Sequence, residues 1–263
     1  MGAEAMAFAK QWQAALVTGA ASGIGRCFAR ELGRRGVALG LIDVSADGLT
    51  GTADLSSKTS KGAESRVADV SDANAITRAV GELVSELGGL DLVIHCAAIL
   101  GPAQFATQSA ADFDKVVSID LLGTANVLRA VLPALRQSRG SVVCVASTAA
   151  VHGWPALAAY SAAKSGVAGF CDAVRGELRR DGVTLTAVFP LLIDTPLLSG
   201  AEIAPILKQG RRLPPESVVE KTLAGAAAGR PRVFVPGSVR LIAALHGLAP
   251  SLLDWYGRRF GLH

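Results

Sequence analysis

Three polar side chains in the middle of the sequence have the types and spacing needed to move a proton at an alcohol or carbonyl oxygen. Tyr160 and Lys164 stand four residues apart in a segment of helical period, so both side chains lie on one face of a helix. A free phenol has a pKa of about 10, and a neighbouring ammonium group favours its ionised form. Tyr160 is therefore the candidate general acid and base. Ser147, at the end of an apolar run, is the candidate holder of the substrate oxygen.

A glycine-rich segment, TGAASGIG at residues 18–25, follows the first apolar run and precedes a helical pattern. Glycines let such a loop turn tightly and let backbone N–H groups reach a pyrophosphate at the start of the helix. A glycine triplet alone is weak evidence, but its place between a strand and a helix predicts a dinucleotide site. The candidate contacts are Gly19, Ser22, Gly23, Ile24 and Gly25.

Two acidic residues end the next two apolar runs. Asp43 stands 18 residues beyond Gly25, where a carboxylate can accept hydrogen bonds from an adenosine ribose and would repel a 2′-phosphate. This position predicts NAD rather than NADP, and the alternative is that Asp43 caps the following helix. Asp69, followed by Val70, can either contact the adenine amino group or cap its helix, and the residues alone do not separate these roles.

Short apolar runs alternate with longer segments of helical period, which is typical of a parallel sheet covered by helices. The expected strands are 14–18, 37–42, 64–68, 90–95, 141–146, 183–189 and 232–235. The expected helices are 23–35, 46–58, 72–87, 109–137, 156–180 and 215–228. The pattern predicts one α/β domain over residues 1–263, with a doubly wound parallel sheet of the Rossmann type. Ligands are expected beyond the carboxyl ends of its strands.

The overall composition fits a compact globular protein and argues against several other classes. Half of the 263 residues are hydrophobic and 18% are charged, which argues against disorder. No apolar run reaches the roughly 18 residues that span a bilayer, so no stable membrane insertion is expected. The formal charge of +4 comes from scattered basic residues, so no nucleic-acid surface is expected. The four cysteines form no CxxC pair, so we expect no metal site and a reducing compartment. The N-terminal residues lack a basic start followed by an apolar core, so we expect no secretory signal and a cytoplasmic protein.

Together these motifs resemble those of the short-chain dehydrogenase/reductase family, in its shorter, NAD-binding form. The resemblance covers residues 12–236 and rests on the glycine loop, the two acidic residues, and Ser147 followed by Tyr160 and Lys164. It implies a reversible interconversion of an alcohol and a ketone or aldehyde, with hydride passing between substrate and NAD. It also implies that Lys164 binds the nicotinamide ribose while it tunes Tyr160.

The resemblance assigns two further loops to the cofactor, and the first departs from the usual family pattern. The family has an Asn-Asn-Ala-Gly-like turn after the fourth strand, where this chain reads HCAA at residues 95–98. We expect backbone groups there, such as those of Ala97, to line the adenosine site. In the loop that begins at Pro190, the resemblance implies that the Ile193 backbone and the Thr195 hydroxyl hold the nicotinamide carboxamide.

The helix position that the family usually gives to Asn is held by Asp120. In the family this residue supports, mainly through its main-chain carbonyl, a water that contacts the lysine. A carboxylate there adds a negative charge near Lys164, so we expect Asp120 to take part in catalysis by making Tyr160 ionise at a higher pH. His95, by contrast, is interpreted as a strand-end residue and not as a catalyst.

The substrate is expected to be a bulky, mainly apolar alcohol or ketone. Residues 191–217 resemble the family's mobile segment that closes over the substrate, and Leu191 stands where the family usually has glycine. The candidate substrate contacts besides Ser147 and Tyr160 are Ala149, Trp154, Leu191, Leu197 and Leu198, with Leu100, Ile203, Ile206 and Leu207 adding apolar surface. The alternative is that these leucines only pack the segment onto the body of the protein.

Two long segments and the end of the chain suggest a homo-oligomer, either a dimer or a tetramer. Segments 109–137 and 156–180 are apolar on more than one side, at Val127, Val131, Leu135, Val167, Phe170 and Val174. Residues 237–263 are expected to form a helical extension that packs on the domain or on a partner subunit. A helix lying on a membrane surface is the weaker alternative for them.

Two other functions remain as alternatives to an alcohol dehydrogenase. A nucleotide-sensing binding protein with little turnover fits the same fold, but it has no need of the Ser147, Tyr160 and Lys164 set. A sugar-nucleotide epimerase or dehydratase resembles longer chains with an added substrate domain. The site residues, rather than the fold, therefore favour the oxidoreductase.

Overall fold

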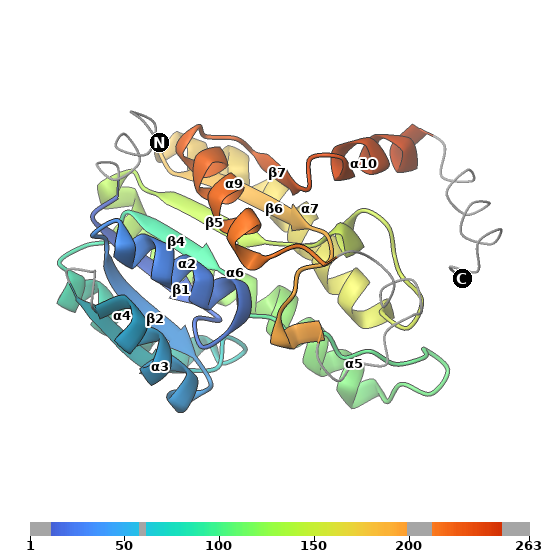
Figure 1. The fold of residues 1–263 in the computed structure, drawn as a ribbon, viewed down its shortest axis with the longest axis horizontal. Coiled ribbons are helices and arrows are strands. Elements are labelled where there is room, and N and C mark those ends of the chain that lie inside the picture. The colour runs from blue at the N-terminus through green and yellow to red at the C-terminus, as the bar shows by residue number, and fades with distance from the viewer. Residues whose placement is uncertain (1–11, 58–61, 199–211, 249–263) are drawn as a thin grey trace.

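The computed structural model describes residues 12–57, 62–198 and 212–248. Within them, seven strands form one parallel sheet in the order β3-β2-β1-β4-β5-β6-β7 (Figure 1). The strands are β1 (Ala14–Thr18), β2 (Ala38–Asp43), β3 (Ala63–Val67), β4 (Leu92–His95), β5 (Ser141–Val145), β6 (Thr184–Pro190) and β7 (Arg232–Val235). The order reverses between β1 and β4, which opens a crevice at the carboxyl ends of the strands. The predicted doubly wound sheet is confirmed, with each strand within two residues of its expected bounds.

Helices cover both faces of the sheet, because each presents one apolar stripe to it. They are α2 (Gly23–Arg34), α3 (Ala46–Ser57), α4 (Ala73–Leu87), α5 (Ala110–Val117), α6 (Gly123–Ser138), α7 (Ala158–Arg180), α9 (Pro215–Ala227) and α10 (Val239–Leu248). One core holds buried side chains of α4, α6 and α7, such as Leu83, Val131 and Val167. The other holds those of α2, α3 and α9, such as Phe28 and Leu223.

The helix expected over residues 109–137 is interrupted in its middle. Between α5 and α6 lies a π-helical turn, η1 (Ser118–Leu122), which holds more residues per turn than an α-helix. Asp120, inside η1, accepts a hydrogen bond from the Ile99 N–H through its side chain and one from the Thr124 hydroxyl through its carbonyl oxygen. The expected helix is therefore present as Ala110–Ser138, within one residue of its expected bounds, and the π-helical turn in its middle is the feature that the sequence pattern did not predict.

By length and composition alone, the 29 residues Ala110–Ser138 could cross a membrane. In this fold they pack on the sheet instead, and Val127, Val131 and Leu135 lie fully inside its core. These three residues, with Val167, were expected to give the helices a second apolar side. That inference was wrong, because all four are buried within this chain.

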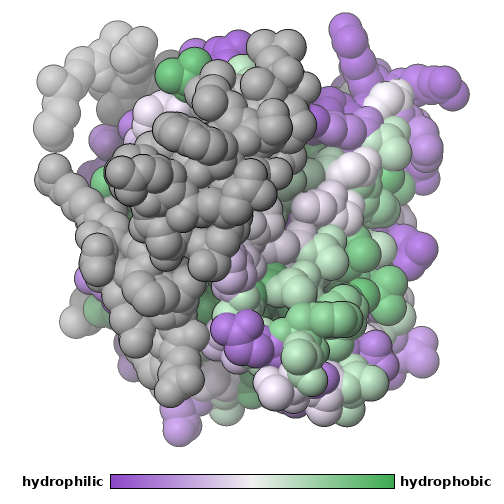
Figure 2. Space-filling model, turned by 90° about the vertical axis from the view of Figure 1, so that its right-hand side faces the viewer, coloured by the Kyte–Doolittle hydropathy of each residue, from purple (hydrophilic) through white to green (hydrophobic). Residues whose placement is uncertain are grey.

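Some apolar surface nevertheless stays open on these helices. Phe170 and Val174 of α7 are only partly buried, and Leu122 is 53% exposed. Figure 2 shows apolar side chains gathered in one area of the face that it presents. Homo-oligomerisation thus stays a prediction with a smaller set of candidate contacts.

Two expected segments fall partly outside the described residues. In the segment 191–217, the structure describes 191–198, with the short helix η3 (Pro196–Leu198), and 212–217, so Ile203, Ile206 and Leu207 lie outside. In the segment 237–263, the structure describes α10, where Val239 is buried and Leu241 is 65% exposed. The expectation of a helix is confirmed for that part.

Candidate active site

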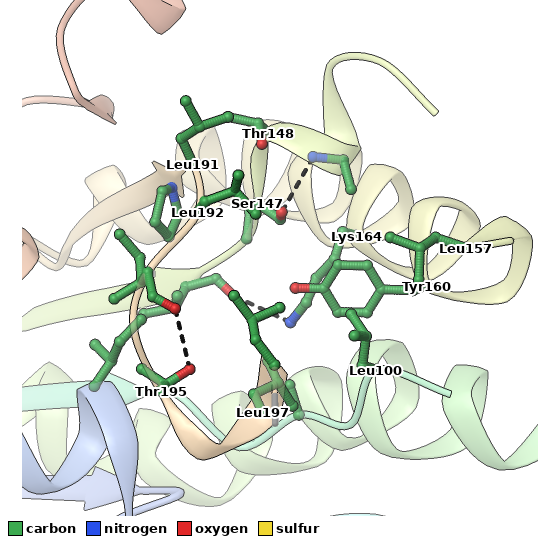
Figure 3. A pocket seen from close by; sticks show the side chains of 18 of the residues that line it. Leu100, Ser147, Thr148, Leu157, Tyr160, Lys164, Leu191, Leu192, Thr195 and Leu197 are labelled. Atoms are coloured by element: carbon green, nitrogen blue, oxygen red, sulfur yellow. Dashed lines mark hydrogen bonds between the residues drawn. The ribbon is translucent and has the colours of Figure 1, made fainter. Parts of the chain in front are cut away.

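Ser147, Tyr160 and Lys164 meet in one cavity at the carboxyl edge of the sheet (Figure 3). Tyr160 and Lys164 project from the first turns of α7, one helical turn apart. Ser147 directly follows β5 and Ala146, and its hydroxyl accepts a hydrogen bond from the Ala149 N–H at 3.1 Å, beginning the short helix η2 (Thr148–Ala150). The Lys164 Nζ atom donates to the Val145 carbonyl at 3.2 Å and lies 5.5 Å from the centre of the Tyr160 ring. The loop after β5 and the first turns of α7, which follow one another in the chain, thus hold one proton-transfer group.

The charges around Tyr160 oppose one another. Burial raises the pKa of the Tyr160 phenol, the Lys164 ammonium lowers it, and the Asp120 carboxylate raises it again, so that the pKa stays above its ordinary value. The Ser147 hydroxyl also lowers the pKa of the phenol. Burial lowers the pKa of Lys164, but the negative charges on Asp120 and Tyr160 outweigh burial and raise it. Lys164 is therefore a permanent cation at neutral pH.

Asp120 lies behind Lys164 and does not line the cavity. Its side chain is fully buried, with Oδ2 at 3.2 Å from Lys164 Nζ and Oδ1 accepting from the Ile99 N–H at 2.9 Å. Burial raises the pKa of the Asp120 carboxyl, while Lys164 and the Ile99 amide oppose that rise. Asp120 was expected to be a catalytic residue. The structure makes it a positioning residue instead, because it can act on Tyr160 only through the charge it places beside Lys164.

His95 ends β4 inside a chain of hydroxyl groups. Its Nδ1 lies 2.7 Å from the Thr18 hydroxyl and its Nε2 lies 3.0 Å from the Thr124 hydroxyl. Burial, with a smaller contribution from Lys164, lowers the pKa of His95 to about 3. The imidazole is therefore neutral and held on both sides, as expected of a strand-end residue.

A second cavity lies over the carboxyl ends of β1 to β4, beside the glycine loop. Its lining includes the expected residues Gly19, Ser22, Gly23, Ile24, Gly25, Asp43, Asp69, Val70, Ala97 and Thr195. A Cβ atom on Gly25 would stand 2.1 Å from the Gly19 carbonyl oxygen, and one on Gly19 would stand 2.7 Å from the Ala97 nitrogen. Gly19 also has a φ of +66°. Only glycine permits this close turn, and the exposed backbone at the start of α2 fits a dinucleotide pyrophosphate.

The two acidic residues of this cavity are held by backbone amides outside the helices that follow them. Asp43 accepts hydrogen bonds from the Ala21 and Ser45 N–H groups at 3.0 and 3.1 Å. The cap of α3 is the hydroxyl of Ser45, so the alternative role of Asp43 as that cap is excluded. Asp69 accepts from the N–H and hydroxyl of Ser71, and the cap of α4 is Asp72. Both carboxylates are thus rigidly placed at the cavity wall.

The cavity around Ser147 is otherwise apolar. Its lining includes the expected cofactor and substrate contacts Ala149, Trp154, Pro190, Leu191, Ile193, Thr195, Leu197 and Leu198. Lys164 is the single charged side chain among its described lining residues. The two cavities share Ile24, Cys96, Ala98, Thr195 and Leu197, so they are continuous where the nicotinamide of a bound dinucleotide would lie.

Several lining residues were not among the sequence candidates. Leu157 and Leu192 join the apolar wall, and the thiol-bearing Cys96 belongs to both cavities. Lys115, on α5, is the one cation among the described residues that line the cofactor cavity. No motif in the sequence marks Lys115, because it reaches the cavity only through the way in which α5 packs beside the glycine loop.

A nucleotide cradle joined to a serine, tyrosine and lysine cavity defines a nicotinamide-dependent oxidoreductase of alcohols and carbonyl compounds. The chain belongs to the short-chain dehydrogenase family, whose sequence model matches residues 13–203. It is 32% identical over 253 residues to estradiol 17-beta-dehydrogenase 11 of Rattus norvegicus, covering 94% of this chain and 83% of that protein. It is 38% identical over 191 residues to levodione reductase of Leifsonia aquatica, covering 71% of each.

Solved structures agree with this assignment. The crystal structure of levodione reductase aligns with a TM-score of 0.76 at 30% identity, covering 86% of this chain and 96% of that one. The crystal structure of the F189W variant of actinorhodin polyketide ketoreductase with NADPH aligns with a TM-score of 0.77 at 30% identity, covering 87% and 97%. The fold and the nicotinamide chemistry are therefore those of this family.

Proposed function

We propose that the protein is an NAD-dependent dehydrogenase/reductase that interconverts a bulky, mainly apolar alcohol with its ketone or aldehyde. The observation that carries this proposal is the composition of the catalytic cavity. The hydroxyls of Ser147 and Tyr160 stand among leucine, alanine and tryptophan side chains, and the buried Lys164 is the one charged group among the described residues of the lining. Such a wall favours an uncharged substrate, because no side chain compensates the loss of hydration of an ionic group.

NAD is the proposed cofactor because two carboxylates line the part of the cofactor cavity that would hold the adenosine. Asp43 and Asp69 line that part, and a carboxylate there accepts from ribose hydroxyls and repels a 2′-phosphate. The related ketoreductase structure contains NADPH, so the choice between the two cofactors needs a direct titration.

The chain's own groups account for the proton and for the orientation of the substrate. In carbonyl reduction the Ser147 hydroxyl holds the carbonyl oxygen, and Tyr160 donates its phenolic proton to that oxygen as negative charge develops. Lys164 stabilises the phenolate that remains, and the proton is replaced from solvent. When bound, the nicotinamide supplies or accepts the hydride. Alcohol oxidation runs the same transfers backwards, with Tyr160 as the base.

Relatives' names support the substrate class without fixing the substrate. Estradiol and levodione, for which two relatives are named, are small alcohol or ketone compounds. In an apolar pocket each buried CH₂ contributes about 0.8 kcal/mol, so three or four added methylenes raise affinity by roughly a hundredfold.

A substrate series tests the proposal. Alcohols and ketones from short-chain to cyclic, long-chain and steroid-like compounds would be assayed with each cofactor, following the absorbance of the reduced nicotinamide. We expect kcat/KM to climb along the series and to be higher with NAD(H). Charged hydroxy acids or sugars that outperform every apolar member would overturn the proposed substrate class. A preference for NADP(H) would overturn the proposed cofactor.

We also propose that the working form is a homo-oligomer. The partly buried Phe170 and Val174 and the exposed Leu122 supply apolar surface on the helices that cover one sheet face. Light scattering at micromolar concentration is expected to give a dimer or tetramer, and a monomer alone would contradict this.

A further inference from the structure

The ion pair between Asp120 and Lys164 is unusual in being sealed from water directly behind the proton-transfer group. Asp120 has no exposed surface and Lys164 is 3% exposed, with 3.2 Å between Oδ2 and Nζ. Oδ2 makes no hydrogen bond in the described structure, so its negative charge is offset mainly by the ammonium group. Removing either partner leaves a buried charge without compensation, which makes the pair a fixed feature of the site near neutral pH.

The pair changes how strongly Lys164 stabilises the phenolate form of Tyr160. An isolated ammonium beside a phenol stabilises the phenolate, and a carboxylate paired with that ammonium offsets part of this stabilisation. The other titratable groups that face this site add little charge. His95 is neutral, since burial lowers its pKa to about 3, and Cys96 is a protonated thiol, since burial raises its pKa to about 12. Asp120 is therefore the group that decides how much of the lysine's charge reaches the phenol.

We infer that the buried Asp120–Lys164 pair suits this site to reducing a carbonyl group, with Tyr160 as a neutral proton donor, rather than to oxidising an alcohol at neutral pH. The inference rests on the proposed role of Tyr160 and adds the working direction. Reduction requires the protonated phenol and oxidation requires the phenolate. Burial raises the pKa of Tyr160, and the Asp120 carboxylate 3.2 Å from the Lys164 ammonium opposes the lowering by that ammonium, so the protonated phenol stays dominant through the neutral range.

Two electrons arrive at the carbonyl carbon as hydride from the reduced nicotinamide, which forms the new C–H bond and breaks the C–O π bond. The oxygen takes the proton from Tyr160 Oη and becomes the hydroxyl of the product. The phenolate that is left regains a proton from solvent, and a high affinity of this phenolate for protons speeds that recovery at neutral pH.

The protein contains two tyrosines, Tyr160 and Tyr256, which permits a direct spectroscopic test. In a Tyr256→Phe background, the tyrosinate absorbance reports the ionisation of Tyr160 alone, without cofactor or turnover. We expect Tyr160 to stay protonated beyond pH about 10, and Asp120→Asn to bring its ionisation down by about one pH unit or more. The asparagine oxygen can still accept the Ile99 N–H bond, and Lys164 Nζ keeps its bond to the Val145 carbonyl, so the variant is expected to fold with a lower stability. Asp114→Asn, which removes an exposed carboxylate from α5, is the matched control and is expected to leave the titration unchanged.

The pH profiles give a second readout. In the wild type, kcat/KM for reduction is expected to stay level through the neutral range while that for oxidation rises with pH. In Asp120→Asn, kcat/KM for reduction is expected to begin to fall at a lower pH than in the wild type. That for oxidation is expected to reach its plateau at a lower pH as well. A Tyr160 that ionises near pH 7 in the Tyr256→Phe background, or one that is unmoved by Asp120→Asn, overturns the inference. Absence of turnover with every alcohol and carbonyl compound, with the titration as expected, would instead refute the proposed function.

Discussion

The cofactor cavity and the substrate cavity share five residues but are constructed in different ways. The first is made of backbone amides and two carboxylates, placed by turns within a few residues of the strand ends. The second is made of apolar side chains brought together from the segments after β4, β5 and β6 and from α7. A pyrophosphate and a ribose need donors and acceptors at fixed points, whereas an apolar substrate needs only volume and the exclusion of water. Substitutions should accordingly have sharp, specific effects in the first cavity and graded effects in the second.

The largest effect is expected at the proton-transfer group of the substrate cavity. Tyr160→Phe removes the proton donor and keeps the ring, and it should lower kcat by at least roughly a hundredfold while NADH still binds. Steady-state assays and NADH fluorescence titrations measure the two quantities separately. Near-normal turnover would show that another group transfers the proton.

In the cofactor cavity, Asp43→Ala should weaken NAD binding by about tenfold and narrow the gap to NADP. The ribose acceptor and the charge that repels a 2′-phosphate are lost together. Calorimetric titration with both nucleotides measures the change, and Asp47→Ala, on the outer side of α3, serves as control. Equal losses for NAD and NADP would mean that Asp43 only shapes the loop through Ala21 and Ser45.

In the substrate cavity, Leu197→Ala should lower kcat/KM by about fivefold for the bulkiest apolar substrate and much less for a short one. Leu197 is 38% exposed, so only part of its apolar surface is available to a substrate. Affinity for the nucleotide is measured in parallel, because Leu197 lines both cavities. The same loss of kcat/KM for short and bulky substrates would contradict the expectation that this apolar wall selects substrates by their apolar size.

The smallest effect is expected at Lys115. An exposed ammonium at the rim of the cofactor cavity should strengthen binding of the negatively charged pyrophosphate, and Lys115→Met should raise the Kd for NADH by about threefold at low salt. The loss should fade at high salt and be missing for adenosine, which carries no phosphate. Lys221→Met, on α9, is the matched control. A change for adenosine as large as that for NADH would point to a packing effect.

The difference between the cofactor cavity and the substrate cavity also explains which residues the sequence could predict. Strands and helices repeat at fixed periods, so their bounds and the positions of Gly25, Asp43 and Ser147 at strand and loop junctions could be inferred. The wall residues Leu157 and Leu192 could not, because one apolar residue in a loop looks like any other until the chain folds. The burial of Val127 and Val131 in their own core was also missed, since a helical wheel does not show how many layers cover a helix.

The π-helical turn Ser118–Leu122 has a consequence for how this chain can change. Successive residues of a helix are rotated by about 100°, so deleting one residue here would turn everything after it relative to α5. Val116 and Val127, which are both buried now, could not then face inward together. Asp120 would also lose its place between Ile99 and Lys164. The segment should therefore tolerate exchange of its exposed side chains but not insertion or deletion, and homologous sequences that keep this ion pair should align through it without gaps.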